Sequence, residues 1–542
     1  MDIDWTATPF DLPGLGGSEA PAIASAAAAK EWAHALPLAN PADVLFRLST
    51  ELDRQNRHPL NPVERLAVLD TLYKPIAFAL EESAKRYGGK PLPPVAGDQM
   101  AFDNAQSLRR ACIHAGLRAL ADSLNGSDAN LQASALQRTL GHLANLQLDF
   151  LRARRQLPSS YWQQVHRLLA LAEAQGLTTT SVRDTARHGD TATTPLAAYG
   201  EALLLHASSP FELSLRQLAW VARWARRWGA KLVLASAPPS NLEALPLTVD
   251  LASGLPPGQR PFAGPGARLL LTHDLRTSLK SRISLLGQGR TPAELQLGDD
   301  CTQPACERLL KQLYTRWCKG GQPRGAERRP ENSPGYAIFG FEGIHYHLSG
   351  GKRLKQSAAL PSIADLRRER EQLATFGTLS THQPTPSDSG VIPPVETDWQ
   401  IKDESATGVR MARPAGSSDK GATKSARINV GQLVALEPPG AGRPFLASLR
   451  WMFQDTDGWL QAGAQLMPGP VEAVGQRAVD GGDVWLHGFL LPPLPVRNEP
   501  ASVLLPAGTF RSGRKLILQQ DGTLTLTRLL ERGEDYERVA YE

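Results

Sequence analysis

The hydrophobic positions of the N-terminal half recur at the period of an α-helix. From about residue 20 to residue 230, apolar side chains return every three or four positions, so each segment would present one apolar face. Two rows of this kind are Leu66, Leu69, Tyr73, Ile76 and Leu80, and Leu136, Leu140, Leu143, Leu146 and Phe150. The pattern predicts an array of amphipathic helices over residues 20–230.

Three predicted helix starts share one arrangement of residues. Asn40, Asn61 and Ser209 each precede a proline, and an acidic residue stands two positions after that proline. The polar side chain can cap free N–H groups, proline loses nothing at the first helical position, and the acid faces the positive end of the helix dipole. Such repeated caps predict stacked antiparallel helices, although no fixed repeat length is found.

Three tryptophans follow one another at four-residue spacing in this half. Trp220, Trp224 and Trp228 would share one face of a helix, with arginines on the other faces. We interpret this face as core packing, and the alternative is a groove that binds a peptide. The helical half is also where we expect an unidentified protein partner to bind.

The pattern becomes mixed beyond the helical half. Residues 231–372 combine short apolar strands with a predicted helix near 304–318, which indicates an α+β module. Within this module, Tyr336–His347 is predicted to form a strand pair or a bent strand. Residues 373–398 are poor in apolar groups and rich in Pro, Ser and Thr, which is typical of a linker.

From residue 399 onward the period of the apolar positions is two. Short alternating runs separated by Gly, Pro and Asp predict a β-barrel over residues 399–480 and additional strands over residues 481–542. The expected fold class is therefore multidomain α+β, with a helical N-terminal half, a mixed middle and an all-β C-terminal barrel.

Composition excludes some classes of protein. The chain has 542 residues, of which 42% are hydrophobic and 21% charged, which favours several folded domains over disorder. The net charge of +5 is small for this length, and no dense stripe of Lys and Arg with interleaved aromatic residues occurs. Nucleic acid is therefore not an expected partner.

Cysteine usage and hydropathy suggest the compartment. Four cysteines are too few for a disulfide scaffold and suit a reducing environment. The segment Met1–Trp5 is acidic, whereas an export signal begins with positive charge. No apolar run approaches the roughly 18 to 20 residues needed to cross a bilayer. We expect a cytoplasmic protein without a membrane span.

One short segment indicates a specific chemistry. Trp399 to Met411 is predicted to form a strand, a polar turn and a second strand, with Asp403, Ser405 and Gly408 at the turn. Asp and Ser side chains bind the backbone of such turns, and glycine permits positive φ or the close approach of a flat ligand. The turn would form a small polar cup on the outside of a barrel, and the alternative interpretation is an ordinary hairpin turn.

The same residues resemble the Asp-x-Ser-x-x-Gly signature of PilZ domains, small β-barrels that bind cyclic di-GMP. The resemblance covers about residues 365–480, and Asp403, Ser405 and Gly408 match position by position. It implies that this turn contacts the bases and the ribose-phosphate. It also implies an Arg-x-x-x-Arg pair before the first strand, whose guanidiniums hold phosphate and stack on guanine.

The arginine half of that signature matches less well. Arg367, Arg368 and Arg370 stand before the linker and are our predicted phosphate contacts, although Glu371 occupies the position where a second arginine is expected. The expected spacing occurs in Arg324-x-x-x-Arg328, but also in other places that have no relation to the turn, so it has little specificity. Two further candidates on neighbouring strands are Arg410 and Arg450.

Other combinations of residues are weaker. Three cysteines and two histidines are of the types that bind zinc, namely Cys301, Cys306, Cys318, His345 and His347. No pair has the two-residue gap of a zinc knuckle, so we expect no metal and no cofactor. No nucleophile elbow or catalytic triad is evident, so we expect no catalytic residues and no enzyme activity.

Together these features predict a cytoplasmic cyclic di-GMP-responsive effector or adaptor. Its PilZ-like barrel would bind the nucleotide, and its helical half would hold a protein partner. The alternative is a scaffold or chaperone-like interaction protein with a degenerate PilZ-like barrel that binds no nucleotide.

Overall fold

The computed structural model comprises two compact units, Met1–Arg324 and Gly325–Glu542. Each unit has its own hydrophobic core. The structure describes residues 3–16, 20–184, 191–239, 246–320, 327–354, 395–416, 427–437, 442–480, 484–520 and 522–542.

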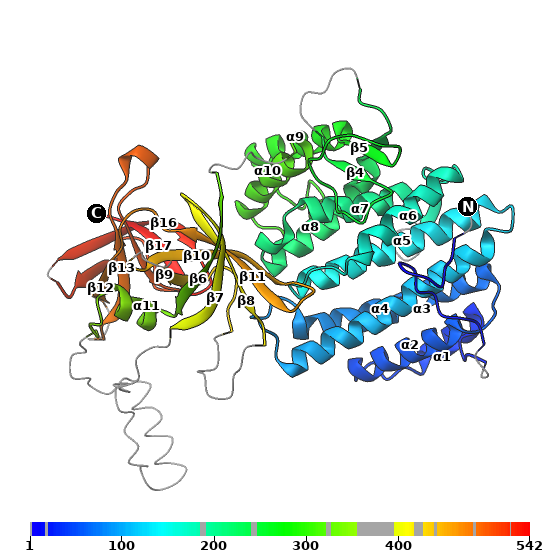
Figure 1. Ribbon diagram of the computed structural model, residues 1–542, viewed down its shortest axis with the longest axis horizontal. Coiled ribbons are helices and arrows are strands. Elements are labelled where there is room, and N and C mark those ends of the chain that lie inside the picture. Colours follow the sequence, from blue (N-terminus) through cyan, green and yellow to red (C-terminus); the bar gives the residue numbers. More distant parts are fainter. Residues whose placement is uncertain are drawn as a thin grey trace, which may run out of the picture. The chain divides into compact units, whose positions relative to one another are not determined.

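The first unit is built mainly from antiparallel helices. Helix α4 packs against α2, α3 and α5, and these helices lie side by side in Figure 1. The helices are α1 (Ala26–His34), α2 (Pro41–Asn56), α3 (Pro62–Tyr87), α4 (Ala96–Ser123), α5 (Ala129–Arg152), α6 (Ser160–Ala174), α7 (Pro195–Ala207), α8 (Leu215–Trp228), α9 (His273–Gly287) and α10 (Ala305–Cys318). The predicted helical N-terminal half is confirmed.

Two of the three predicted caps hold the helices that follow them. Asn40 accepts a hydrogen bond from the N–H of Asp43, at 3.3 Å, and Asn61 accepts one from Val63, at 2.9 Å. Ser209 differs, because it lies in the left-handed region and makes no capping bond, and only a short 3-10 turn follows it. The long helix α8 is capped instead by Ser214, which forms a capping box with Gln217.

The tryptophans of α8 lie in the core. Trp220, Trp224 and Trp228 are at most 2% exposed and pack with the buried apolar side chains of α9 and α10. The indole N–H of Trp220 donates to Asp300, at 2.7 Å, and that of Trp224 donates to the Leu297 carbonyl, at 2.9 Å. The core interpretation of this face is confirmed, and a peptide groove on it is excluded because no face of these rings is open.

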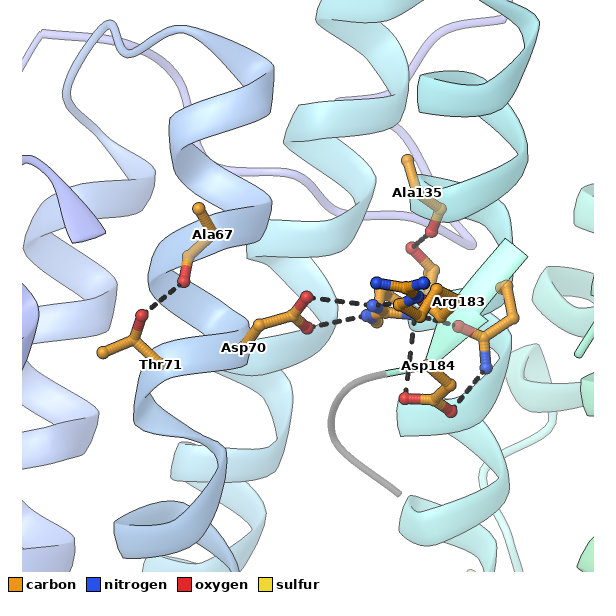
Figure 2. Close-up of polar contacts among 9 residues, drawn as sticks. Ala67, Asp70, Thr71, Ala135, Arg183 and Asp184 are labelled. Carbon is orange, nitrogen blue, oxygen red and sulfur yellow. Dashed lines mark hydrogen bonds and ion pairs between the residues drawn. The ribbon is translucent and has the colours of Figure 1, made fainter. Parts of the chain in front are cut away.

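A buried ionic cluster joins three elements of the helical unit. Arg138 of α5 donates to both carboxylate oxygens of Asp70 on α3, at 2.8 and 2.9 Å. Asp184 of β1 (Val182–Asp184) lies 3.7 Å from the same guanidinium and accepts from Gln137, at 3.0 Å. Figure 2 shows the two carboxylates approaching from different sides. The cluster attaches the short hairpin of β1 and β2 (Thr191–Thr193) to the helices.

A small antiparallel sheet completes the first unit. Strand β5 (Ala267–Leu271) pairs with β3 (Val233–Ala235) on one side and β4 (Thr248–Asp250) on the other. The mixed character predicted for the middle region is confirmed by this sheet together with α9 and α10.

The second unit contains two closed six-stranded antiparallel barrels, and both can be followed in Figure 1. The first barrel has the order β10-β11-β8-β7-β6-β9 and the second the order β12-β13-β14-β17-β16-β15. The first contains β6 (Arg329–Phe339), β7 (Glu396–Ser405), β8 (Gly408–Pro414), β9 (Leu433–Glu437), β10 (Phe445–Gln454) and β11 (Trp459–Leu466). The second contains β12 (Glu472–Ala478), β13 (Leu486–Leu491), β14 (Ser502–Pro506), β15 (Lys515–Leu518), β16 (Thr523–Arg532) and β17 (Tyr536–Tyr541).

The all-β C-terminal fold is therefore confirmed, with two differences from the expected divisions. The strands predicted as additions over residues 481–542 close a barrel of their own together with β12. Strand β6, which the sequence pattern grouped with the middle module, pairs with β7 and β9 and belongs to the first barrel. Most of the expected linker lies outside the described residues, and β7 begins at Glu396.

Helix α11 (Phe341–Leu348) occupies the place where a second strand was expected. Gly340 has a φ of +81°, which turns the chain after β6 and starts the helix. The helix packs against strands of both barrels, and its Ile344 is fully buried with Phe489 and Leu433. The prediction of a strand pair over Tyr336–His347 is correct only for the part within β6, because α11 has a core face to bury.

In the part of the chain that the structure describes, each helix is too short or too polar to form a transmembrane span.

Candidate functional site

The predicted signature turn is the hairpin between β7 and β8. Ser405 pairs directly with Gly408, and the Ser405 hydroxyl donates to the Gly408 carbonyl at 3.1 Å. Gly408 has no positive φ. A Cβ at Gly408 would lie 2.7 Å from the carbonyl oxygen of Ala464 on β11, so the glycine permits a close approach between strands. Asp403 lies on β7, directly opposite Arg410 of β8.

The carboxylate of Asp403 lies beside two guanidiniums. Arg328 forms an ion pair and a hydrogen bond with it, and the Arg410 guanidinium is 3.9 Å away. The Asp403 side chain is 17% exposed, whereas Arg328 and Arg410 are 35% and 43% exposed, so both cations are accessible from solvent. Asp403 is thus flanked by two partly exposed guanidiniums at this place on the barrel.

Strand pairing explains why Arg328 reaches Asp403. Arg328 immediately precedes β6, and Pro330 of β6 pairs with Asp403 of β7. The two residues are 75 positions apart in the sequence but adjacent in the barrel. Arg328 therefore stands directly before the first strand of this barrel, beside the turn.

The other predicted arginines are distributed differently. Arg367, Arg368 and Arg370 lie outside the described residues, as does Arg324. Arg450 is the extra residue of a β-bulge in β10, and its guanidinium pairs with Glu531 of the second barrel at 2.6 Å. Of the arginines considered from the sequence, Arg328 and Arg410 are the two that the described part of the chain brings to the turn.

A row of residues continues from Asp403 across the outside of the barrel. Arg410 pairs with Gly463 of β11, and Gly463 pairs with Trp451 of β10. The Trp451 indole lies over Gly463, where a Cβ would be only 2.2 Å from the ring. Trp451 and Phe453 are stacked with ring centroids 5.8 Å apart, and both are partly exposed.

Sequence reasoning missed this aromatic pair. Adjacent strands lie about 4.8 Å apart, so the ring over Gly463 is two strand steps, or roughly 10 Å, from Asp403. A flat ligand of that length could contact the turn, the guanidiniums and the indole on one face. The signal in the sequence was the alternation Trp451-x-Phe453 facing Gly463, which becomes visible only when the strand register is known.

No three His, Cys, Asp or Glu side chains gather as a metal site in the described part of the chain. Cys318 lies at the last position of α10 and Cys306 near its first, so the helix separates them by roughly 18 Å. The helix therefore keeps these two thiols too far apart to bind one metal ion.

Two protein-family models match the chain. The one described as "Cyclic-di-GMP receptor FimW, N-terminal domain" matches residues 27–239, which extend from α1 to beyond β3. The one described as "FimW C-terminal beta-barrel domain" matches residues 474–542, which contain almost all of the second barrel. Residues 240–473, including the first barrel and its signature turn, lie between these two matches.

A curated relative aligns with most of the chain. The cyclic-di-GMP receptor FimW of Pseudomonas aeruginosa (strain PAO1) is 20% identical over an alignment of 533 positions, which covers 91% of this chain and 86% of the relative. The description of the N-terminal family model and the name of this relative both contain the words cyclic-di-GMP receptor. These matches make the N-terminal helical region and the C-terminal barrel of this chain similar to the two domains described for the cyclic-di-GMP receptor FimW.

Proposed function

We propose that this protein is a cyclic di-GMP receptor that binds the nucleotide on the outside of its first barrel, which we interpret as PilZ-like. The observation that carries the proposal is the contact between Arg328 and Asp403. This contact brings Arg328, which precedes the first strand of the barrel, to the signature turn, although the two are far apart in the sequence. The name of the FimW relative supports the same ligand.

The chemistry of these side chains suits a cyclic dinucleotide. Guanidiniums form bidentate, charge-assisted hydrogen bonds with phosphate and stack on flat bases. In this proposal Arg324 and Arg328 hold the phosphates and one guanine, while Asp403 and Ser405 contact the base and the ribose-phosphate. Trp451 supplies an apolar surface for a second base, because an indole stacks on any purine.

Without ligand, the two main contact residues of the site form an ion pair with each other. Arg328 and Asp403 neutralise one another in the absence of ligand, so a phosphate must compete with the carboxylate for the guanidinium. The pair is partly exposed, and such pairs contribute only about 0–1 kcal/mol. The competition is therefore weak, and Asp403 can turn to the guanine base when the phosphate takes its partner.

Isothermal titration calorimetry with cyclic di-GMP tests the proposal. Arg328→Ala and Asp403→Ala should each weaken binding by about 1.5–3 kcal/mol, or about 10- to 150-fold, because each removes charge-assisted hydrogen bonds. Arg443→Ala is a matched control, since this exposed arginine precedes β10 at the end opposite Trp451. GTP and cyclic di-AMP control for nucleotide specificity.

The same titration decides between the two sets of arginines. A triple replacement of Arg367, Arg368 and Arg370 by alanine should leave the affinity unchanged if Arg324 and Arg328 hold the phosphates. If the triple variant loses affinity and Arg328→Ala does not, the phosphate contacts would instead belong to Arg367, Arg368 and Arg370. Unchanged affinity in both Arg328→Ala and Asp403→Ala would reject the site on this barrel.

The effector part of the proposal concerns the helical unit. We propose that this unit holds a protein partner and that nucleotide binding in the cytoplasm changes how it does so. The alternative, a scaffold with a degenerate barrel, predicts no heat of binding for cyclic di-GMP under any condition. A pull-down with the isolated partner, with and without nucleotide, would then measure the coupling between the two sites.

A further inference from the structure

One strand of the first barrel carries both the aromatic part of the proposed nucleotide surface and a contact with the second barrel. Strand β10 presents Trp451, whose indole lies over Gly463 of β11. The residue before it, Arg450, is the extra residue of the bulge, and its guanidinium forms an ion pair with Glu531 of β16 at 2.6 Å. Two successive side chains of β10 thus contact two different structures, the ligand surface and the second barrel.

Ser448, two positions before Arg450, makes a second contact between the barrels. The hydroxyls of Ser448 and Tyr536, the first residue of β17, are hydrogen-bonded at 3.0 Å. The Tyr536 hydroxyl also donates to the carboxylate of Glu531, which is the partner of Arg450. These four side chains therefore form one connected chain of polar contacts that begins and ends on β10.

The backbone beside the bulge is connected to the second barrel as well. The Gly431 N–H donates to the Leu449 carbonyl at 2.7 Å, and the Gly431 carbonyl accepts from the Glu534 N–H, also at 2.7 Å. Glu534 lies in the turn between β16 and β17. A Cβ at Gly533 of this turn would collide with the Gly431 carbonyl, so the turn packs closely against the first barrel. Each of the three residues Ser448–Arg450 is thus connected to the hairpin of β16 and β17.

We propose that Tyr536 and Glu531 are positioning residues for the nucleotide site. They fix the bulge of β10 and so hold the Trp451 indole over Gly463, in the orientation in which it can stack on a base. A bulge leaves one residue outside the ladder and bends its strand, so the direction of the next side chain depends on what holds the extra residue. This inference rests on the proposed function and extends it, because it makes the second barrel a part of the nucleotide site without contact to the ligand.

The two side-chain contacts differ in strength. The side chains of Arg450 and Glu531 are 39% and 23% exposed, and such an ion pair contributes little by itself. Ser448 and Tyr536 are fully buried, and a buried hydroxyl that loses its partner costs more than an exposed one. Removal of the Tyr536 hydroxyl should therefore loosen the bulge more than neutralisation of Glu531 does.

A double-mutant cycle in the full chain tests the proposal, with cyclic di-GMP as the ligand in isothermal titration calorimetry. Tyr536→Phe keeps the ring and removes only the hydroxyl, and it should weaken binding roughly 3- to 10-fold, near the lower end of the coupling within one network. In the Trp451→Ala background the same replacement should have no further effect, because the indole that it positions is absent. Glu531→Gln should behave in the same way with a smaller loss.

The matched control is Tyr541→Phe. Tyr541 lies at the other end of β17, roughly 17 Å along the strand from Tyr536, so its replacement should leave the affinity unchanged. Hydrogen exchange without ligand gives a second comparison of the two variants. The amides of Ser448–Met452 should exchange faster in Tyr536→Phe than in Tyr541→Phe. Equal exchange would overturn the proposal, whether or not the protein binds nucleotide.

The titrations separate this inference from the proposed function. If Trp451→Ala weakens binding and Tyr536→Phe does not, the inference is wrong and the proposed site stands. If Tyr536→Phe weakens binding equally with and without Trp451, its hydroxyl has only a general structural role, and the inference is again wrong. If the natural protein gives no heat of binding, the proposed function and the inference both fail.

Discussion

Gly408 of the signature turn allows a test of why this position requires glycine. Gly408 stands at the start of β8, where its backbone pairs with Ser405 and with Gln465 of β11. In Gly408→Ala the new Cβ would lie 2.7 Å from the carbonyl oxygen of Ala464. Ordinary contacts begin near 3.4 Å, and the opposing atom is backbone in a strand paired on both sides, so it cannot rotate away.

The expected cost follows from this overlap. Overpacking of a well-packed region typically costs about 1–3 kcal/mol, and we expect Gly408→Ala to lie in that range. Gly416 is the matched control, because it follows β8 with open space around it and no positive φ. Gly416→Ala should be neutral, or stabilising by about 0.4–1 kcal/mol through the unfolded chain.

Hydrogen exchange of the full chain measures this cost within the barrel. Amides of β8 and β11 in Gly408→Ala should exchange roughly 5- to 150-fold faster than in the natural protein, which corresponds to the same 1–3 kcal/mol. Amides of α4 and α5 should not change, because they belong to the other unit. Equal exchange in Gly408→Ala and Gly416→Ala would refute the steric argument and leave ligand contact as the reason for glycine.

Three further predictions concern other parts of the molecule. Replacing Arg138 by Met should lower the free energy of unfolding of the helical unit by about 3–5 kcal/mol, measured in urea. The reason is that Asp70 and the buried Asp184 both lose the guanidinium of Arg138. A loss below about 1 kcal/mol would mean that water solvates these two carboxylates. Burial lowers the pKa of His345 to about 4 from its ordinary 6.5, and also lowers that of His487, whose ring centroid is 4.8 Å away. Between those pH values the unfolded chain binds more protons than the folded one, so the free energy of unfolding should fall as the pH drops from about 6.5 towards 4. His345→Gln should reduce this pH dependence, while the neighbouring Glu342 and His347 are unchanged. By circular dichroism, a fragment of residues 327–542 should show more strand and a larger unfolding transition than a fragment of residues 395–542, which keeps the second barrel but lacks β6 of the first. Equal transitions would contradict the closure of the first barrel.

The helical unit was largely predictable from the sequence because its determinants are local. Asn40 and Asn61 cap helices within three residues of their own position, and hydrogen bonds of that range depend on little else. The face formed by Trp220, Trp224 and Trp228 follows from the helical period alone. Ser209 shows where prediction from local sequence fails. Its sequence pattern matches a helix cap, but its backbone adopts the left-handed conformation and its side chain makes no capping bond.

The candidate site was only half predictable. Asp403, Ser405 and Gly408 lie within one hairpin, so their spacing in the sequence is also their spacing in space. The spacing of Arg324 and Arg328 recurs elsewhere in the chain and cannot by itself select a partner. Only the pairing of β6 with β7, across an intervening helix and residues 355–394, selects Arg328.

The periods of the apolar positions located most of the helices and strands and the change from one period to the other, although Phe341–Leu348 is a helix where a strand was expected. Tertiary structure alone decided that the strands close into two barrels instead of one, since β6 pairs with β9 and β14 with β17 across long stretches of chain. It also decided that Trp451 lies over Gly463. Alternation of polar and apolar residues identifies the faces of a strand but not its neighbours, because every exposed edge offers the same backbone hydrogen bonds.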